Sequence, residues 1–106
     1  MFALAFDLEV AQVVLHHPSH NPTTAYGDIR KTLTNRGFEW TQGSLYVLRN
    51  EDMSILFQAI QDLTRLPWFP PSVRDIRAFR VEQWSNFTAM VKGLPTGGGP
   101  TGGSTP

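Results

Sequence analysis

The chain has 106 residues, with nine basic and nine acidic side chains and no cysteine. This length suits one domain, and the lack of cysteine excludes a disulfide framework and a thiolate zinc site and fits a cytoplasmic protein. The balanced charge gives no overall sign of nucleic-acid binding, although a local basic stretch can provide it. No apolar run has the length needed to cross a bilayer, so we expect no membrane partner.

The first eight residues, MFALAFDL, form an almost unbroken apolar run that predicts a strand buried on both faces. Alternation places the large apolar side chains on one face, whereas the other face is small and ends in the charge of Asp7. A carboxylate at the end of an apolar strand is costly to bury without a purpose. Asp7 is therefore the first candidate site residue, with a hydrogen-bonded cap or an ion pair as the structural alternative.

The segment after this strand predicts a helix that begins after a histidine-rich loop. We expect residues 9–15 to be extended or weakly helical and residues 16–21 to form a loop. Asn21 and Pro22 are an N-cap residue and a first-turn proline. The apolar residues that follow recur at helical spacing and predict a helix over 22–36.

The middle of the chain predicts a hairpin and a second helix. Strands are expected over 38–41 and 44–49, on either side of a Gln-Gly turn. Asn50 is expected to cap a helix that ends near residue 65, before Pro67.

The last third of the domain predicts one more long strand. Residues 68–71 read as a rigid aromatic loop, residues 73–81 as the strand and residues 85–92 as a short helix. The glycine, proline, serine and threonine residues that follow cannot build a core. We therefore expect a domain over 1–93 and a flexible tail over 94–106.

The order strand, helix, strand, strand, helix, strand predicts an α+β, ferredoxin-like β-α-β-β-α-β sandwich with a short C-terminal helix; another α+β topology is the alternative. The ferredoxin-like sheet has order 4-1-3-2, with the first strand between two antiparallel neighbours. The end of the first strand then lies beside the starts of the third and fourth strands. This arrangement brings Asp7, Ser44 and Asp75 to one sheet edge, although ordinary turn chemistry also explains Ser44.

Two neighbouring carboxylates have three chemical uses. Asp7 and Asp75 can hold Mg²⁺, which prefers hard oxygen ligands; they can divide into an acid and a base; or they can pair with Arg74 and Arg77 as structural ion pairs. Alternation places Arg74 and Arg80 on one face and Arg77 on the other, beside Asp75. These arginines are candidate contacts to RNA phosphates, with a solvated edge strand as the alternative.

The histidines and the aromatic residues are weaker candidates. Histidine often serves as the general acid or base in metal-free ribonucleases, but we expect His16, His17 and His20 to be solvated loop residues. Large aromatic side chains can stack on bases, although packing in the core or in a dimer is the favoured interpretation. These side chains are Trp40, Trp68, Phe69 and Trp84.

Four segments, MFALAFDL, AYGDIRKTL, GFEWTQGSLYV and WFPPSVRDIRAFRVEQWSNFT, resemble the bacterial virulence-associated protein D (VapD) family over residues 1–92. The histidine loop and the tail lie outside the matching pattern. The resemblance implies a homodimer similar to small ferredoxin-like CRISPR-associated nucleases. It also implies an endoribonuclease that cleaves single-stranded RNA, in some members as the toxin paired with a small antitoxin protein.

The resemblance also matches site residues to this chain. It implies catalytic roles for Asp7, Ser44 and Asp75, and Val13 is the nearest match to a hydrophobic position of the family site. We therefore predict an endoribonuclease in which Asp7 is a general base or a Mg²⁺ ligand. The alternative is a non-catalytic dimeric module that binds nucleic acid or an antitoxin. The residues predicted to bind RNA are Arg74, Arg77 and Arg80.

Overall fold

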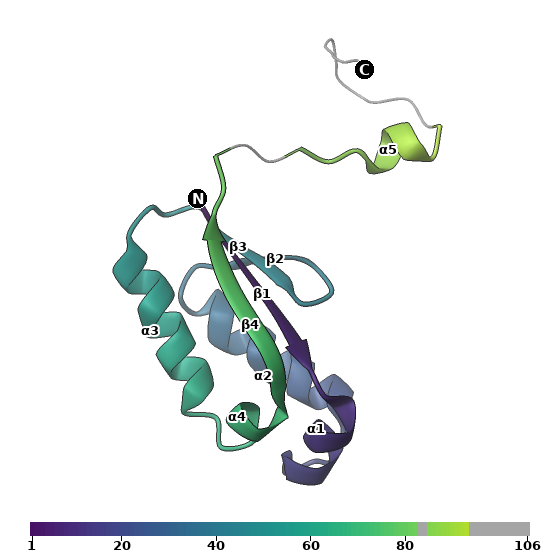
Figure 1. Cartoon of the computed structure of the whole chain (residues 1–106), viewed down its shortest axis with the longest axis vertical. Coiled ribbons are helices and arrows are strands. Elements are labelled where there is room, and N and C mark those ends of the chain that lie inside the picture. Colours follow the sequence, from purple (N-terminus) through teal and green to yellow (C-terminus); the bar gives the residue numbers. More distant parts are fainter. Residues whose placement is uncertain (83–84, 94–106) are drawn as a thin grey trace.

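The computed structural model describes residues 1–82 and 85–93, which form a four-stranded antiparallel sheet with helices in an α+β fold (Figure 1). The predictions for Trp84 and for the tail at 94–106 lie outside the described residues. No helix in the described ranges is long and apolar enough to span a membrane. In chain order the elements are β1 (Phe2–Leu8), α1 (Val10–His16), α2 (Pro22–Thr34), β2 (Glu39–Gln42), β3 (Leu45–Leu48), α3 (Met53–Thr64), α4 (Phe69–Ser72), β4 (Val73–Arg80) and α5 (Thr88–Val91).

The sheet has the order β2-β3-β1-β4, so β1 lies between β3 and β4 and runs antiparallel to both. In the β1–β4 ladder Asp7 is paired with Asp75, but the next residue, Leu8, is paired with Val73. Arg74 is thus an extra residue in β4, as in a β-bulge. Bulges bend a strand locally and change the direction of side chains near them.

The core lies between one face of the sheet and the helices α2 and α3 (Figure 1). The large side chains of β1 point to this face, as the alternation predicts, and the opposite face of β1 carries Ala3, Ala5 and Asp7. The buried side chains that meet in the core from these elements and from β3 are Phe2, Leu4, Phe6, Tyr46, Leu48, Ala25, Ile29, Leu33, Leu56, Ala59 and Leu63.

The two long helices begin with side-chain caps. The α2 cap is Asn21, as predicted, and its side chain accepts a hydrogen bond from the Thr23 N–H. The α3 cap is Asp52 rather than Asn50, because the Asp52 carboxylate accepts from both the N–H and the hydroxyl of Ser54. Asn50 lies two residues earlier, and its side chain accepts a hydrogen bond from the Asp52 N–H.

Two short helices complete this part of the fold; the sequence leaves the first open between extended and weakly helical and predicts the second as a loop. The segment expected to be extended or weakly helical is α1, in which only Val13 is buried. The expected rigid aromatic loop is α4, whose prolines lie in the first turn, where N–H groups have no partner within the helix. The Ser72 hydroxyl donates to the Trp68 carbonyl at 2.6 Å and closes this turn.

Candidate functional site

The predicted convergence of Asp7 and Asp75 is confirmed by the sheet. The two residues are direct cross-strand partners at the end of β1, where β4 begins. Directly opposed residues of an antiparallel pair have Cβ atoms about 5 Å apart. Both side chains are exposed, with 60% of Asp7 and 48% of Asp75 accessible to solvent. Two carboxylates from distant parts of the sequence thus reach water at one sheet edge.

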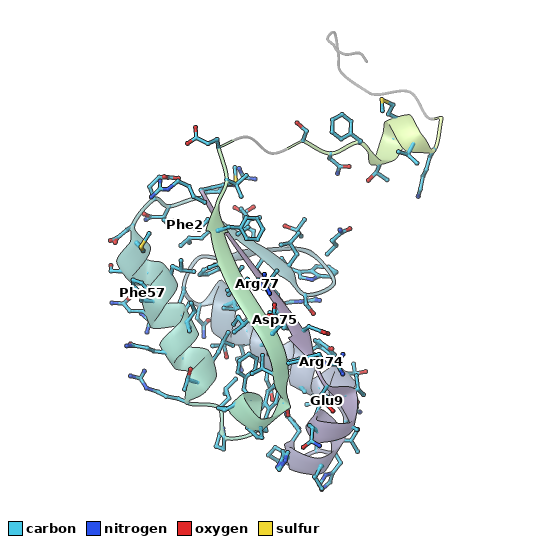
Figure 2. All side chains as sticks on the ribbon, in the orientation of Figure 1. Phe2, Glu9, Phe57, Arg74, Asp75 and Arg77 are labelled. Atoms are coloured by element: carbon cyan, nitrogen blue, oxygen red, sulfur yellow. The ribbon has the colours of Figure 1, made fainter. Side chains whose placement is uncertain are left out.

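Each of these carboxylates has an arginine partner. The Arg77 Nε donates to both oxygens of Asp75, at 3.0 and 3.2 Å, and Figure 2 shows Arg74, Asp75 and Arg77 in succession along β4. The Arg74 Nη1 lies 3.5 Å from an Asp7 oxygen. Strict alternation predicts Arg74 on the other face, but the bulge makes Arg74 an unpaired residue beside Asp7. All four side chains are largely exposed, so each ion pair contributes at most about 1 kcal/mol to stability.

Ser44 lies beside this edge but not directly opposite Asp7. It belongs to the turn between β2 and β3, after Gly43, whose φ of 49° is in the left-handed region that favours glycine. The Ser44 carbonyl accepts a hydrogen bond from the Phe6 N–H at 3.2 Å. Ser44 is therefore bonded to Phe6, the residue before Asp7, whereas Asp75 is the direct cross-strand partner of Asp7. Ser44 is thus offset from Asp7 by one residue along the strand.

Arg80 lies at the opposite end of β4 from the carboxylate pair. It is paired with Phe2 in the β1–β4 register, and its guanidinium lies 4.9 Å from the centre of the Phe2 ring. Its Nη1 also donates to Glu51. Five residues of strand separate Arg80 from Asp75, which corresponds to about 16 Å. A role of Arg80 at the Asp7 edge would therefore require an extended substrate.

The donor set at the edge fits a magnesium ion. Mg²⁺ is often bound by one or two carboxylates, with waters and substrate phosphates as its other ligands. Asp7 and Asp75 could provide the carboxylate oxygens. Within residues 1–82 and 85–93, no group of three or more His, Cys, Asp or Glu side chains is arranged to hold a metal ion. An ion at this edge would therefore take most of its ligands from water and from a bound substrate.

His17 is not the solvated loop residue that the sequence predicts. Only 4% of it is exposed, and its Nε2 lies 2.7 Å from an Asp28 oxygen. Its Nδ1 accepts from the N–H of Ser19, and its ring meets Trp68 edge to face at 4.9 Å. His17 thus anchors the connection between α1 and α2. The other two histidines, His16 and His20, are exposed.

The other aromatic candidates differ in burial. Trp68 and Phe69 are buried in the core, as the packing interpretation predicts. Val13, the hydrophobic position implied by the family resemblance, is also fully buried. Trp40 differs from these residues, because 45% of it is exposed to solvent.

Comparison with known proteins identifies several relatives over nearly the whole described region, although no protein-family model matches the chain. The "Endoribonuclease VapD homolog" of Neisseria gonorrhoeae is 58% identical over 92 residues, which are 87% of this chain and 99% of the relative. The "Endoribonuclease VapD" of Dichelobacter nodosus is 50% identical over 93 residues, 88% of this chain and 99% of the relative. That of Helicobacter pylori is 45% identical over 94 residues, with 87% and 99% covered.

Proposed function

Because the chain belongs to the VapD family of endoribonucleases, we propose that it cleaves single-stranded RNA at the edge where Asp7 and Asp75 meet. The observation that carries this proposal is the direct pairing of two exposed aspartates, each beside an arginine. Cleavage of a phosphodiester needs a group that accepts a proton and cations that stabilise charge developing on the phosphate. Carboxylates and guanidinium groups at this edge supply both.

The two ion pairs suit binding of an RNA backbone. Arg74 and Arg77 are held by Asp7 and Asp75, respectively, in exposed pairs. A guanidinium binds phosphate in the same forked geometry as it binds carboxylate, and an exposed pair costs little to break. RNA phosphates would draw the arginines away and leave Asp7 free to accept a proton. Ser44 would contact a phosphate or a water molecule from the neighbouring turn, and Arg80 would contact the backbone farther along.

Two roles of Asp7 fit this geometry. As a general base, Asp7 would take a proton from the attacking hydroxyl group or water. As a metal ligand, Asp7 would hold Mg²⁺ together with Asp75, and the ion would supply charge stabilisation at the phosphate. In both roles the arginines orient the phosphodiester.

The test is RNA cleavage by Asp7→Asn beside a matched control. Removal of an acid–base group lowers cleavage about 10²- to 10⁴-fold, and the exposed position of Asp7 predicts an unchanged melting temperature. Glu9→Gln is the control, because Glu9 is an exposed carboxylate two residues away whose side chain makes no cap hydrogen bond. Loss of wild-type cleavage on chelation, with recovery in Mg²⁺, assigns the metal role. Equal cleavage by wild type and Asp7→Asn refutes the site.

The same proposal includes a ferredoxin-like fold class and two protein partners, a second copy of the chain and a small antitoxin. The position of β1 between β3 and β4 supports the ferredoxin-like class. On the sheet face opposite the core, Phe79 is 49% exposed, whereas its neighbours Ala3 and Val47 are buried. The exposed Phe79 ring supports a homodimer, which a light-scattering mass would test. A small antitoxin protein is a further partner that the family resemblance supports.

The alternative function is a dimeric module that binds RNA or an antitoxin without cleavage. The observation in its favour is that both aspartates are already paired with arginine, as they would be in a purely structural role. This alternative predicts RNA binding by the wild type with no cleavage in any divalent metal.

A further inference from the structure

Trp40 on β2 is exposed but held in one orientation. Its indole N–H donates to the Gly43 carbonyl at 2.9 Å. The Arg30 guanidinium, from α2, lies over the indole ring at 3.9 Å from its centre. These two contacts come from different elements and fix the ring, while 45% of the residue stays open to solvent. A fixed aromatic surface binds a planar ligand with little loss of conformational entropy.

Arg30 differs from the other arginines among the described residues. Within residues 1–82 and 85–93, Arg30 has no carboxylate partner, and its charge faces the Trp40 ring instead. An indole that can stack and a guanidinium without an anionic partner form a combination suited to a nucleotide, since bases stack on aromatic rings and phosphates bind guanidinium groups. The arginines that do form ion pairs with carboxylates are Arg36, Arg49, Arg65, Arg74, Arg77 and Arg80.

The turn between β2 and β3 connects Trp40 to the Asp7 edge. The carbonyl that accepts the indole hydrogen bond belongs to Gly43, and the next residue, Ser44, accepts a hydrogen bond from Phe6. Phe6 immediately precedes Asp7. The tryptophan therefore lies against the same turn that borders the carboxylate pair.

The register gives the separation of Trp40 and Asp7. Trp40 is paired with Tyr46 on β3, and Tyr46 is paired with Leu4 on β1. Two strand spacings and three residues of strand rise then separate Trp40 from Asp7, which corresponds to about 14 Å between their backbones. Trp40 is on the helix side of the sheet and Asp7 on the other side, so a strand of RNA would pass around the turn.

We propose that Trp40 and Arg30 form a nucleotide subsite for single-stranded RNA, a few nucleotides from the phosphodiester at Asp7. The indole stacks on one base, and the guanidinium binds a neighbouring phosphate. Because every base has an aromatic face, stacking here sets affinity and the register of the strand without selecting a sequence. This subsite rests on the proposed function in naming RNA as its ligand, but its residues do not take part in the chemistry.

The first measurement is the affinity for a short oligouridine labelled with a fluorophore, in the presence of a chelator. Trp40→Leu is expected to weaken binding about ten-fold, the effect of losing one stacked base, whereas Trp40→Phe keeps most of the affinity. Phe57→Leu is the matched control, since Phe57 is an exposed aromatic residue on α3. Arg30→Gln is expected to reduce the salt dependence by about 0.7 in slope, and Arg65→Gln, which removes an arginine paired with Asp62, is not.

The second measurement uses oligonucleotides that each carry one abasic nucleotide at a different position. With the wild type, one position is expected to weaken binding, and with Trp40→Leu the same position is expected to have no further effect. A Trp40→Leu protein that binds the whole series like wild type overturns the subsite. A change in the oligomeric mass of the Trp40→Leu protein also overturns the subsite, because it would show that Trp40 contacts another subunit.

Cleavage by the wild type, measured on the same RNAs, separates the two proposals. Normal cleavage with binding that does not depend on Trp40 refutes the subsite alone. Binding that depends on Trp40, with no cleavage in any divalent metal, refutes the endoribonuclease and leaves the subsite in place.

Discussion

Replacing His17 by leucine should destabilise the protein without altering the candidate site. The His17 Nε2 bonds to Asp28 at 2.7 Å, and its Nδ1 accepts from the Ser19 N–H at 3.0 Å and lies 2.8 Å from the Ser19 hydroxyl. Because Nδ1 accepts from an N–H, we infer that Nε2 carries the proton that is donated to Asp28. Leucine keeps an apolar side chain against Trp68 but removes all three hydrogen bonds.

The expected loss follows from where the partners of His17 lie. The Asp28 side chain is 43% exposed and Ser19 is exposed, so water can replace the lost hydrogen bonds and no buried group is left unpaired. The two contacts with Ser19 share the single Nδ1 lone pair and count as one neutral bond. Together with the bond to the charged Asp28, at the low end of its range, they sum to about 2 to 3 kcal/mol. For a domain of this size that loss lowers the melting temperature by roughly 8 to 24 °C.

Thermal unfolding followed by circular dichroism at neutral pH measures this effect. Ser19→Ala, which removes the hydroxyl alone, is expected to cost about 1 kcal/mol. His16→Leu is the matched control, because His16 is exposed and bonds only to the Gln12 side chain in the described part of the chain. If His17→Leu has the same melting temperature as His16→Leu, at most about 2 °C below that of wild type, the anchoring role of His17 is refuted.

Two further predictions concern stability. The pKa of Asp62 is held below its ordinary value by the Arg36 hydrogen bonds. The stability that this ion pair adds is therefore complete above the ordinary aspartate pKa of ~4 and is lost as the pH falls through the lower pKa of the folded state. The melting temperature of Asp62→Asn should accordingly fall less steeply with acid than that of wild type, and an equal decrease in both proteins would contradict this. Asp52→Ala should cost about 1 kcal/mol in urea unfolding as the loss of the α3 cap, whereas a larger loss from Asn50→Ala would restore Asn50 as the cap.

The sequence predicts those parts of the fold that depend on local pattern. The alternation in residues 2–8 identifies both faces of β1, because large and small side chains separate there without exception. Asn21 and Pro22 predict the start of α2, since a cap and a first-turn proline act within one turn. Local signals of this kind need no knowledge of the rest of the chain.

The elements that the sequence leaves open or predicts wrongly lack such a decisive local pattern. In α1 only Val13 is buried, so no apolar stripe reveals the helix. In α4 two prolines suggest a loop, and only the short length of the helix places both in its first turn. For α3, Asn50 and Asp52 are both good caps by residue type, and the backbone conformation of the chain decides between them.

The same distinction applies to the candidate site. Asp7 and Asp75 meet because of the strand order, which can be inferred once the elements are assigned. The contact of Arg74 with Asp7 depends on a single extra residue in β4, and strict alternation predicts the wrong face for Arg74 because it assumes an unbroken register. The pairing of His17 with Asp28 joins two segments through a loop, and no spacing rule in the sequence marks it. Residues whose environment depends on such irregular backbone can therefore be assigned only from the folded chain, and at this edge they include one of the two arginines that hold the carboxylates.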